Sequence, residues 1–185
     1  MVKLELIGLD CQRTRNGSEA GERTTMTEAR QPHDTAARSV RLLDGLRSFG
    51  ANYTELTGRF AAWLGLHSTD AAALVEILYA EDKGTPLSPT RLSERLSLTT
   101  GATTNLLNRL EKLRHIVRTR EHADRRKVTL RSSARIEKPA REFFGPFSER
   151  FNALVAQYPP EQLEQFENFL AQLCATMGEL PDAAE

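Results

Sequence analysis

The sequence predicts a mainly α-helical protein with one small β hairpin, and three observations predict it. Apolar residues recur every three or four positions through much of residues 35–177, which is the spacing of amphipathic helices. From residue 116 the pattern changes to β-branched residues that alternate with basic ones, which is typical of strands. Serine, threonine, proline and glycine separate these segments at the positions where helices begin and end.

Length and composition favour one compact domain. The chain has 185 residues, of which 39% are hydrophobic, and we expect a domain at residues 34–180. Residues 1–33 are polar and lack a sustained period, so we expect a disordered extension. No apolar run reaches the roughly 18 residues that span a bilayer, and the first nine residues are too short and acidic for a signal peptide. Cys11 and Cys174 suggest no disulfide framework, so we expect a cytoplasmic protein.

The flanking segments predict helices that join two copies of the chain. An apolar stripe predicts a helix at residues 35–64, which three glycines are placed to bend. Two further helices follow the hairpin within residues 134–177, at Ala134–Tyr158, with kinks at its two prolines, and at Glu161–Met177. These stripes are more apolar than the surface helices of a monomer require, so we expect a homodimer built from both ends.

Three helices lie between the flanking segments. The first is predicted at Asp70–Glu81, capped by Ser68 or Thr69. Ser88-Pro89 then favours a short helix at Pro89–Leu96, because serine caps helices well and proline suits the first helical position. After a tight turn, Thr99 is placed to cap a helix at Thr100–Leu113.

A basic hairpin comes directly after these helices. Its strands are predicted at Ile116–Arg120 and Arg126–Leu130, with a tip between them. Two short helices joined by a tight turn and followed by such a hairpin make a winged helix-turn-helix, here at residues 68–131.

Charge is distributed unevenly along a chain of zero net charge. Between Arg91 and Arg131 the sequence has eleven basic and four acidic residues, a net charge of +7, and the remainder therefore carries −7. A basic block in an acidic chain is typical of a DNA-facing surface, although taken alone it is also typical of a solvated charged face. The helix pair and hairpin that carry this charge favour DNA.

The predicted docking follows from the dimensions of B-DNA. The major groove is about 12 Å wide and admits one helix, here Thr100–Leu113, while the hairpin reaches the neighbouring minor groove. The exposed side of that helix offers short hydrogen-bonding groups to base edges, and the hairpin offers cations to phosphates. The predicted DNA-binding residues are Thr100, Gly101, Thr104, Asn105, Asn108, Arg109, Arg118, Arg120, Asp124, Arg125, Arg126 and Lys127.

The segment PLSPTRLSERLSLTTGATTNLLNRLEKL, followed by IVRTREHADRRKVTL, resembles the MarR family of transcription regulators. The resemblance covers roughly Leu42 to Met177. Asp124 and Arg126 match the family's Asp-x-Arg wing motif, and Thr99–Ala102 matches the start of its recognition helix. The resemblance implies a homodimer that reads a pseudo-palindromic operator. It also implies that a small, often phenolic, ligand releases the DNA.

Two positions depart from the family's pattern. Arg114 stands where the family usually has glycine before the first wing strand, and residues 131–134 (RSSA) replace its usual threonine and glycine after the second strand. Neither departure removes a predicted DNA contact. The two departures affect instead the expected backbone geometry where the chain enters and leaves the wing.

Aromatic residues of the first helix suggest a ligand site. Phe49, Tyr53, Phe60 and Trp63 either line a cavity or form dimer core, and Tyr53, Phe60 and Trp63 are the predicted ligand-binding residues. The four histidines have no metal-binding spacing, and we expect no metal, cofactor or catalytic residues. The sequence thus predicts a sequence-specific, ligand-responsive repressor. The alternative is a winged-helix module that binds proteins and never contacts DNA.

Overall fold

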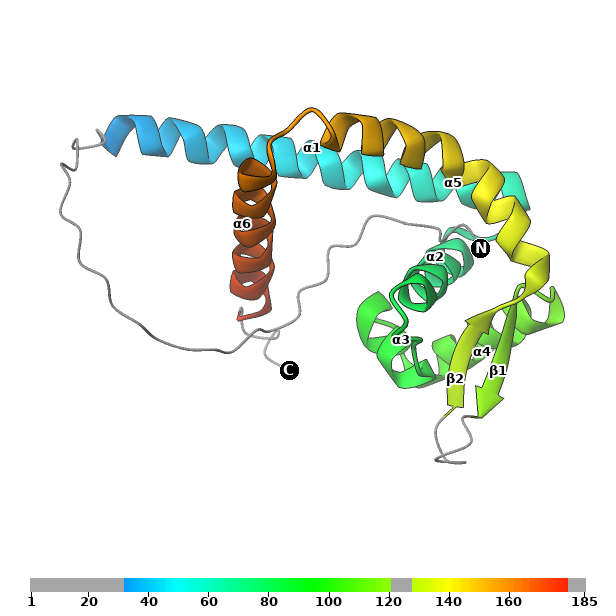
Figure 1. Cartoon of the computed structure of the whole chain (residues 1–185). Coiled ribbons are helices and arrows are strands. Elements are labelled where there is room, and N and C mark those ends of the chain that lie inside the picture. Colours follow the sequence, from blue (N-terminus) through cyan, green and yellow to red (C-terminus); the bar gives the residue numbers. More distant parts are fainter. Residues whose placement is uncertain (1–31, 121–127, 180–185) are drawn as a thin grey trace.

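The computed structural model describes residues 32–120 and 128–179, and these residues confirm the predicted fold class. Figure 1 shows a winged core beside long flanking helices. The elements are α1 (Pro32–Leu64), α2 (Ser68–Asp82), α3 (Pro89–Leu96), α4 (Thr100–Lys112), β1 (Ile116–Arg120), β2 (Val128–Ser132), α5 (Ala134–Val155) and α6 (Pro160–Gly178). Most of the predicted N-terminal extension lies outside the described residues. Within the described ranges, no helix is both long and apolar enough to cross a membrane.

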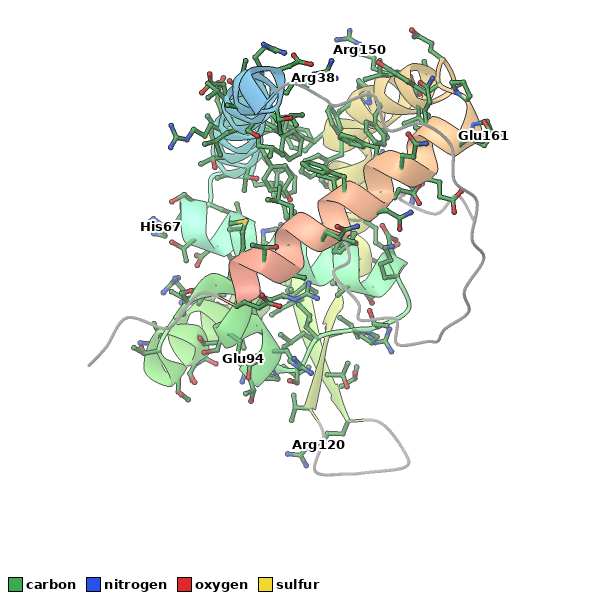
Figure 2. All side chains as sticks on the ribbon, turned by 90° about the vertical axis from the view of Figure 1, so that its left-hand side faces the viewer. Arg38, His67, Glu94, Arg120, Arg150 and Glu161 are labelled. Carbon is green, nitrogen blue, oxygen red and sulfur yellow. The ribbon has the colours of Figure 1, made fainter. Side chains whose placement is uncertain are left out.

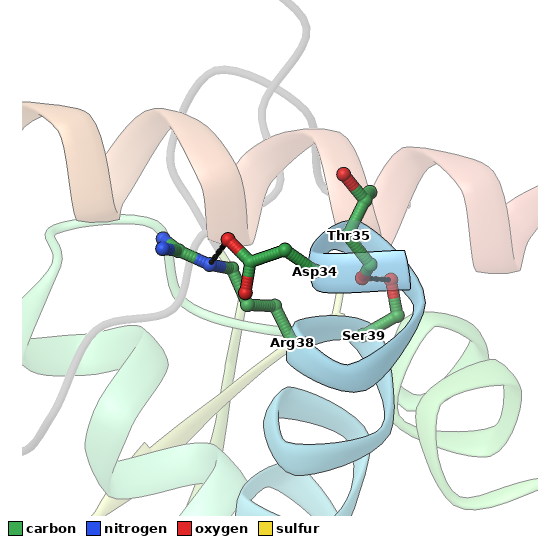
Figure 3. Close-up of polar contacts among 4 residues, drawn as sticks. All are labelled: Asp34, Thr35, Arg38 and Ser39. Atoms are coloured by element: carbon green, nitrogen blue, oxygen red, sulfur yellow. Dashed lines mark hydrogen bonds and ion pairs between the residues drawn. The ribbon is translucent and has the colours of Figure 1, made fainter. Parts of the chain in front are cut away.

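Helix α1 runs unbroken through the three glycines that were placed to bend it. Gly45, Gly50 and Gly58 all face open space, so each costs helix stability only through its backbone entropy. The first turns are held by local contacts: Arg38 Nε donates to Asp34 Oδ2 at 2.9 Å, and Ser39 Oγ donates to the Thr35 carbonyl at 3.0 Å (Figure 3). The N-terminal half of α1 is therefore supported by its own side chains.

The hydrophobic core gathers around α2. This helix is apolar on most of its circumference, and eight of its fifteen residues are buried. Leu74 and Ile77 are fully buried in a core cluster to which α1, α3, α4, both strands and α5 also contribute side chains. The other large core residues are Phe60, Leu92, Leu106, Leu107, Leu110, Ile116, Leu130, Ile136 and Phe144. One core thus joins every element of the helix-turn-helix to the hairpin.

The helix pair begins at the predicted caps. Ser88 Oγ accepts a hydrogen bond from the Arg91 amide, and Thr99 Oγ1 accepts one from the Ala102 amide, each at 3.2 Å. The predicted cap of α2 is wrong: α2 begins at Ser68 with His67 in the cap position and no side-chain cap bond.

Two further sequence predictions about these helices need correction. The predicted helix Thr100–Leu113 ends one residue earlier, so that Leu113 is the C-cap of α4 and is 44% exposed. Helix α5 continues through Pro139 and Pro146 and ends at Val155, before the predicted Tyr158. Its axis bends in Figure 1, as helices that contain proline do.

The hairpin is antiparallel, and its second strand is described over Val128–Ser132, since residues 126 and 127 of the predicted strand lie outside the described residues. Val117 pairs with Arg131 and Arg118 pairs with Leu130. The strand β2 extends to Ser132, which pairs with Ile116, and Thr129 and Leu130 are buried at its centre. The Leu130 amide donates to the Leu87 carbonyl at 2.8 Å, so the chain between α2 and α3 hydrogen-bonds to the hairpin. The predicted tip lies outside the described residues.

Candidate nucleic-acid interface

Helix α4 separates a buried stripe from a polar exposed face. Its buried residues are Thr103, Leu106, Leu107 and Leu110, at the spacing of one face of a helix. The opposite side exposes five of the predicted DNA-binding residues, which are Thr100, Gly101, Thr104, Asn105 and Asn108. Thr104 Oγ1 donates to the Thr100 carbonyl at 2.9 Å, which leaves its oxygen available as an acceptor. This face therefore offers short donors and acceptors and no large apolar side chain.

Arg109 has a different environment from these residues. Its Nε donates to Asp70 Oδ2 at 3.0 Å and its Nη2 donates to Asp70 Oδ1 at 2.6 Å, so the guanidinium is held against α2. The hydrogen bond to Asp70 is the main reason that the pKa of Arg109 is raised. The sequence placed Arg109 among the residues that contact DNA, whereas its contacts in the structure lie within the protein.

Arg118 connects the hairpin to α4. Its Nη2 donates to Asn108 Oδ1 at 2.8 Å, and its Nε lies 3.4 Å from Glu111 Oε2. Asn108 and Arg118 were predicted as separate contacts to a base and to a phosphate. The structure instead joins them into one polar group at the junction of helix and wing.

The exposed end of β1 carries Arg120. Figure 2 shows Arg120 at the free end of the hairpin, far from Arg38 at the start of α1. Because strand residues alternate between faces, Arg118 and Arg120 share one face of the hairpin. The remaining predicted wing residues, Asp124, Arg125, Arg126 and Lys127, lie outside the described residues.

The base of the hairpin is fixed by residues that the sequence did not single out. Glu81 Oε2 accepts a hydrogen bond from the Ser132 amide at 2.7 Å and lies on α2. The Ser133 amide donates to the His115 carbonyl at 2.9 Å, and its hydroxyl donates to the Arg114 carbonyl. The acidic end of α2 was the available signal for Glu81, but the helical pattern does not show which strand it faces.

Arg114 explains one departure from the family pattern. Its φ is +59°, in the left-handed region that favours glycine. The chain therefore enters the wing with the backbone conformation that suits glycine, although arginine occupies the position. Arg114 therefore keeps a backbone conformation that suits the glycine usual at this position.

The predicted ligand residues do not share one environment. Phe60 is fully buried and packs on Phe143 and Phe144, with ring centroids 5.0 and 4.7 Å away. Trp63 is half exposed and covers Phe143 at 5.5 Å. Tyr53 is 40% exposed, and partial burial, followed by the charge of Glu76, raises its pKa. Phe60 is thus a core residue, and only Tyr53 and Trp63 present an aromatic surface.

Comparison with known proteins agrees with this architecture. The model of the MarR family matches residues 64–127. The HTH-type transcriptional regulator YcgE of Bacillus subtilis is 31% identical over 116 residues, which cover 63% of this chain and 73% of that protein.

Solved structures of S. aureus MepR share the fold. MepR in its DNA-binding conformation aligns with a TM-score of 0.56 at 19% identity, covering 71% of this chain and 95% of MepR. The MepR–DNA complex aligns with a TM-score of 0.51 at 18% identity, covering 71% of this chain and 93% of the MepR chain. The MepR structures share the fold, and the Bacillus relative together with the family match shows that the chain belongs to the MarR family of transcription regulators.

Proposed function

We propose that this protein is a sequence-specific DNA-binding repressor in which α4 enters the major groove and the hairpin lies over the adjacent minor groove. The observation that carries the proposal is the exposed polar face of α4 beside a basic hairpin. Asparagine side chains pair with adenine through two hydrogen bonds, so Asn105 suits base reading. S. aureus MepR, which has the same fold, has been solved as a complex with DNA, and this supports the assignment.

Gly101 supports close approach of a partner to the start of α4. A Cβ at this position would meet no atom of the protein within 4 Å, so packing within the chain does not require glycine. Glycine within a helix costs roughly 1 kcal/mol relative to alanine. A benefit outside the chain offsets that cost, and close approach of a DNA backbone is such a benefit.

The wing supplies cations that fix the register on the duplex. We assign Arg118 and Arg120 to phosphates, which position a protein without reading sequence. Arg125 or Arg126 is proposed to enter the minor groove, oriented by Asp124, with Lys127 on a phosphate. A DNA partner also places the protein in the cytoplasm.

The active form is proposed to be a homodimer that α1, α5 and α6 hold together. Helix α6 has an apolar stripe but no buried residue in the single chain. Covering such side chains contributes about 1.5–3 kcal/mol each, so the helix needs a partner surface. Exposed large apolar residues of these three helices and of the turn between α5 and α6 are Val40, Leu42, Leu43, Phe49, Tyr53, Trp63, Leu154, Tyr158, Phe166, Phe169 and Met177. Two copies related by a twofold axis would read a pseudo-palindromic operator.

Release by a small aromatic ligand is the remaining part of the proposal. Tyr53 and Trp63 leave aromatic surface exposed on α1, which also packs against the winged core. A ligand held there would contact both the dimer helix and the DNA-binding unit. Fluorescence of Trp63, the lone tryptophan, should change with phenols or aromatic acids that weaken DNA binding.

Selection of bound fragments from random DNA tests the central proposal. We expect an enriched motif with two inverted half-sites, and an affinity for it that falls steeply with salt concentration. The Asn105→Ala variant is the matched control and should lose preference within the half-sites. An unenriched pool together with salt-independent binding would instead favour the protein-binding alternative.

A further inference from the structure

One ion pair joins the recognition helix to the helix behind it. Asp70 lies in the first turn of α2 and is 2% exposed, and among the described residues it is the one charged side chain buried in the core. Both of its carboxylate oxygens accept hydrogen bonds from Arg109, at 3.0 and 2.6 Å, across 39 residues of sequence. A paired geometry of this kind restricts both distance and angle.

The ends of the two helices strengthen this pair. A carboxylate near the N-terminus of α2 and a cation near the C-terminus of α4 each interact favourably with the helix dipole. A carboxylate buried without its cation is strongly unfavourable. The side chain of Arg109 is 48% exposed, yet its guanidinium is held at Asp70, because that carboxylate is buried and both of its oxygens accept hydrogen bonds from Arg109.

The position of Arg109 on α4 gives the pair a consequence for the exposed face. At 3.6 residues per turn, Arg109 lies roughly a third of a turn from the middle of the buried stripe, on the side next to Asn105. The leucines of the stripe hold α4 against the core through non-directional contacts. The two hydrogen bonds from Arg109 to Asp70 are directional, so they resist rotation of α4 about its axis.

We propose that Arg109 is a positioning residue and that the Asp70–Arg109 pair sets the rotation of α4, and with it the sequence discrimination of Thr104, Asn105 and Asn108. The inference rests on the proposed DNA-binding function and adds the residues that determine its specificity. Arg109 contacts neither bases nor phosphates in this account. A rotation of α4 displaces the base-reading side chains while leaving the wing and its cations in place.

The experiment compares Asp70→Asn, Arg109→Lys and Arg109→Gln in the full-length chain. Affinities for the selected duplex and for a random duplex are measured at several salt concentrations. We expect the ratio of the two affinities to fall about tenfold in each variant, with the salt slope unchanged. The Arg95→Lys variant is the matched control: Arg95 also pairs with α2, at 2.8 Å from Glu76, but through an exposed contact, and its ratio should not change.

Three other results would overturn the inference. A salt slope lowered by about one unit in Arg109→Gln would show a phosphate contact. Lost preference at a single base pair in the Arg109 variants, with Asp70→Asn like the parent, would show direct base reading. An unchanged ratio with weaker binding to both duplexes would show a role in stability alone, because partial unfolding lowers both affinities equally.

Folding of the variants is checked by thermal unfolding before binding is measured. If a single variant is unfolded, the double variant Asp70→Asn, Arg109→Gln is measured in place of that single variant. It replaces the buried ion pair with two neutral side chains that can hydrogen-bond to each other. Failure of the proposed function is distinguishable, because the parent protein itself would then not discriminate between the two duplexes. A parent that discriminates, with variants that discriminate equally well, contradicts only the positioning role.

Discussion

In the winged core apolar side chains face one another, whereas in α6 and the N-terminal half of α1 they face outward. Eight of the fifteen residues of α2 are buried, but none of the nineteen residues of α6 is. Both helices carry apolar stripes, so composition does not distinguish them. The difference shows that the core is complete within one chain, and it supports the proposal that a second copy covers the flanking helices.

The largest effect should come from a cavity in the core. Leu74 is fully buried, and Leu74→Ala should lower the free energy of unfolding by about 2–5 kcal/mol. Urea denaturation measures this loss. The stability of the variant should depend on protein concentration no more than that of the parent does, because Leu74 contacts no second copy in our account. A loss below about 1 kcal/mol would mean that the core is loosely packed.

A substitution on α6 should act on association instead. Phe166 is 55% exposed, and Phe166→Ser should weaken the dimer by about 1.5–3 kcal/mol for each side chain uncovered. Sedimentation equilibrium gives the dissociation constant. Glu167→Gln, at an exposed neighbouring position, is the control and should leave association unchanged. Equal dissociation constants for Phe166→Ser and the parent would place the interface elsewhere.

Asn105 and Arg118 should respond differently to DNA sequence. Asn105→Ala should cost about 1–3 kcal/mol on the preferred duplex and little on random DNA, with the salt slope unchanged. Arg118→Ala should weaken both duplexes and lower the slope by about one unit. Because Arg118 also donates a hydrogen bond to Asn108, the Arg118→Ala variant should in addition reduce the preference at one base pair. Identical profiles for the two variants would contradict base reading by α4.

A smaller effect should come from the entry to the wing. Arg114 has a φ of +59°, which costs an ordinary residue about 1–2 kcal/mol. Arg114→Gly removes that strain but makes the unfolded chain more flexible, so we expect a net gain of about 0.5–1 kcal/mol. Thermal unfolding measures it, with Arg141→Gly, at an exposed position inside α5, as a control that should destabilise. Destabilisation by Arg114→Gly would mean that its side chain has a stabilising contact.

The smallest effect concerns pH. Burial lowers the pKa of His115, and the nearby charge of Arg135 lowers it further, so the folded protein prefers the neutral imidazole. Stability from this group is present above the unfolded pKa of about 6.5 and is lost as pH falls through the folded pKa. Urea denaturation at pH 7.5 and 5.5 should show a larger acid-induced loss for the parent than for His115→Gln. Equal losses would exclude His115 as the cause.

Local signals in the sequence predicted local structure well. The Ser88 and Thr99 caps and the strand Ile116–Arg120 each depend on neighbouring residues, and each was confirmed. The cap of α2 was wrong because Ser68 and Thr69 are equally good candidates by residue type. The structure assigns both to the helix itself.

Contacts between distant segments could not be predicted in the same way. Periodicity placed Arg109 at the edge of the exposed face of α4, but it could not show that Asp70, 39 residues earlier, reaches the guanidinium. Likewise, Glu81 and the Ser132 amide are 51 residues apart. The one signal for Asp70 was an acidic residue directly before the apolar run Ala71–Val75, since such a residue needs a cation when it is buried.

The attachment of the hairpin has a consequence for how operator preference diverges. Leu87, Glu81 and His115 each hydrogen-bond to the chain between Leu130 and Ser133, so the base of the wing is fastened to the helix-turn-helix at three points. Substitutions or insertions between residues 121 and 127 leave all three points intact. Under the proposed docking, related regulators with this attachment can therefore acquire new preferences at the flanks of their operators through residues 121–127, while keeping the half-site assigned to α4.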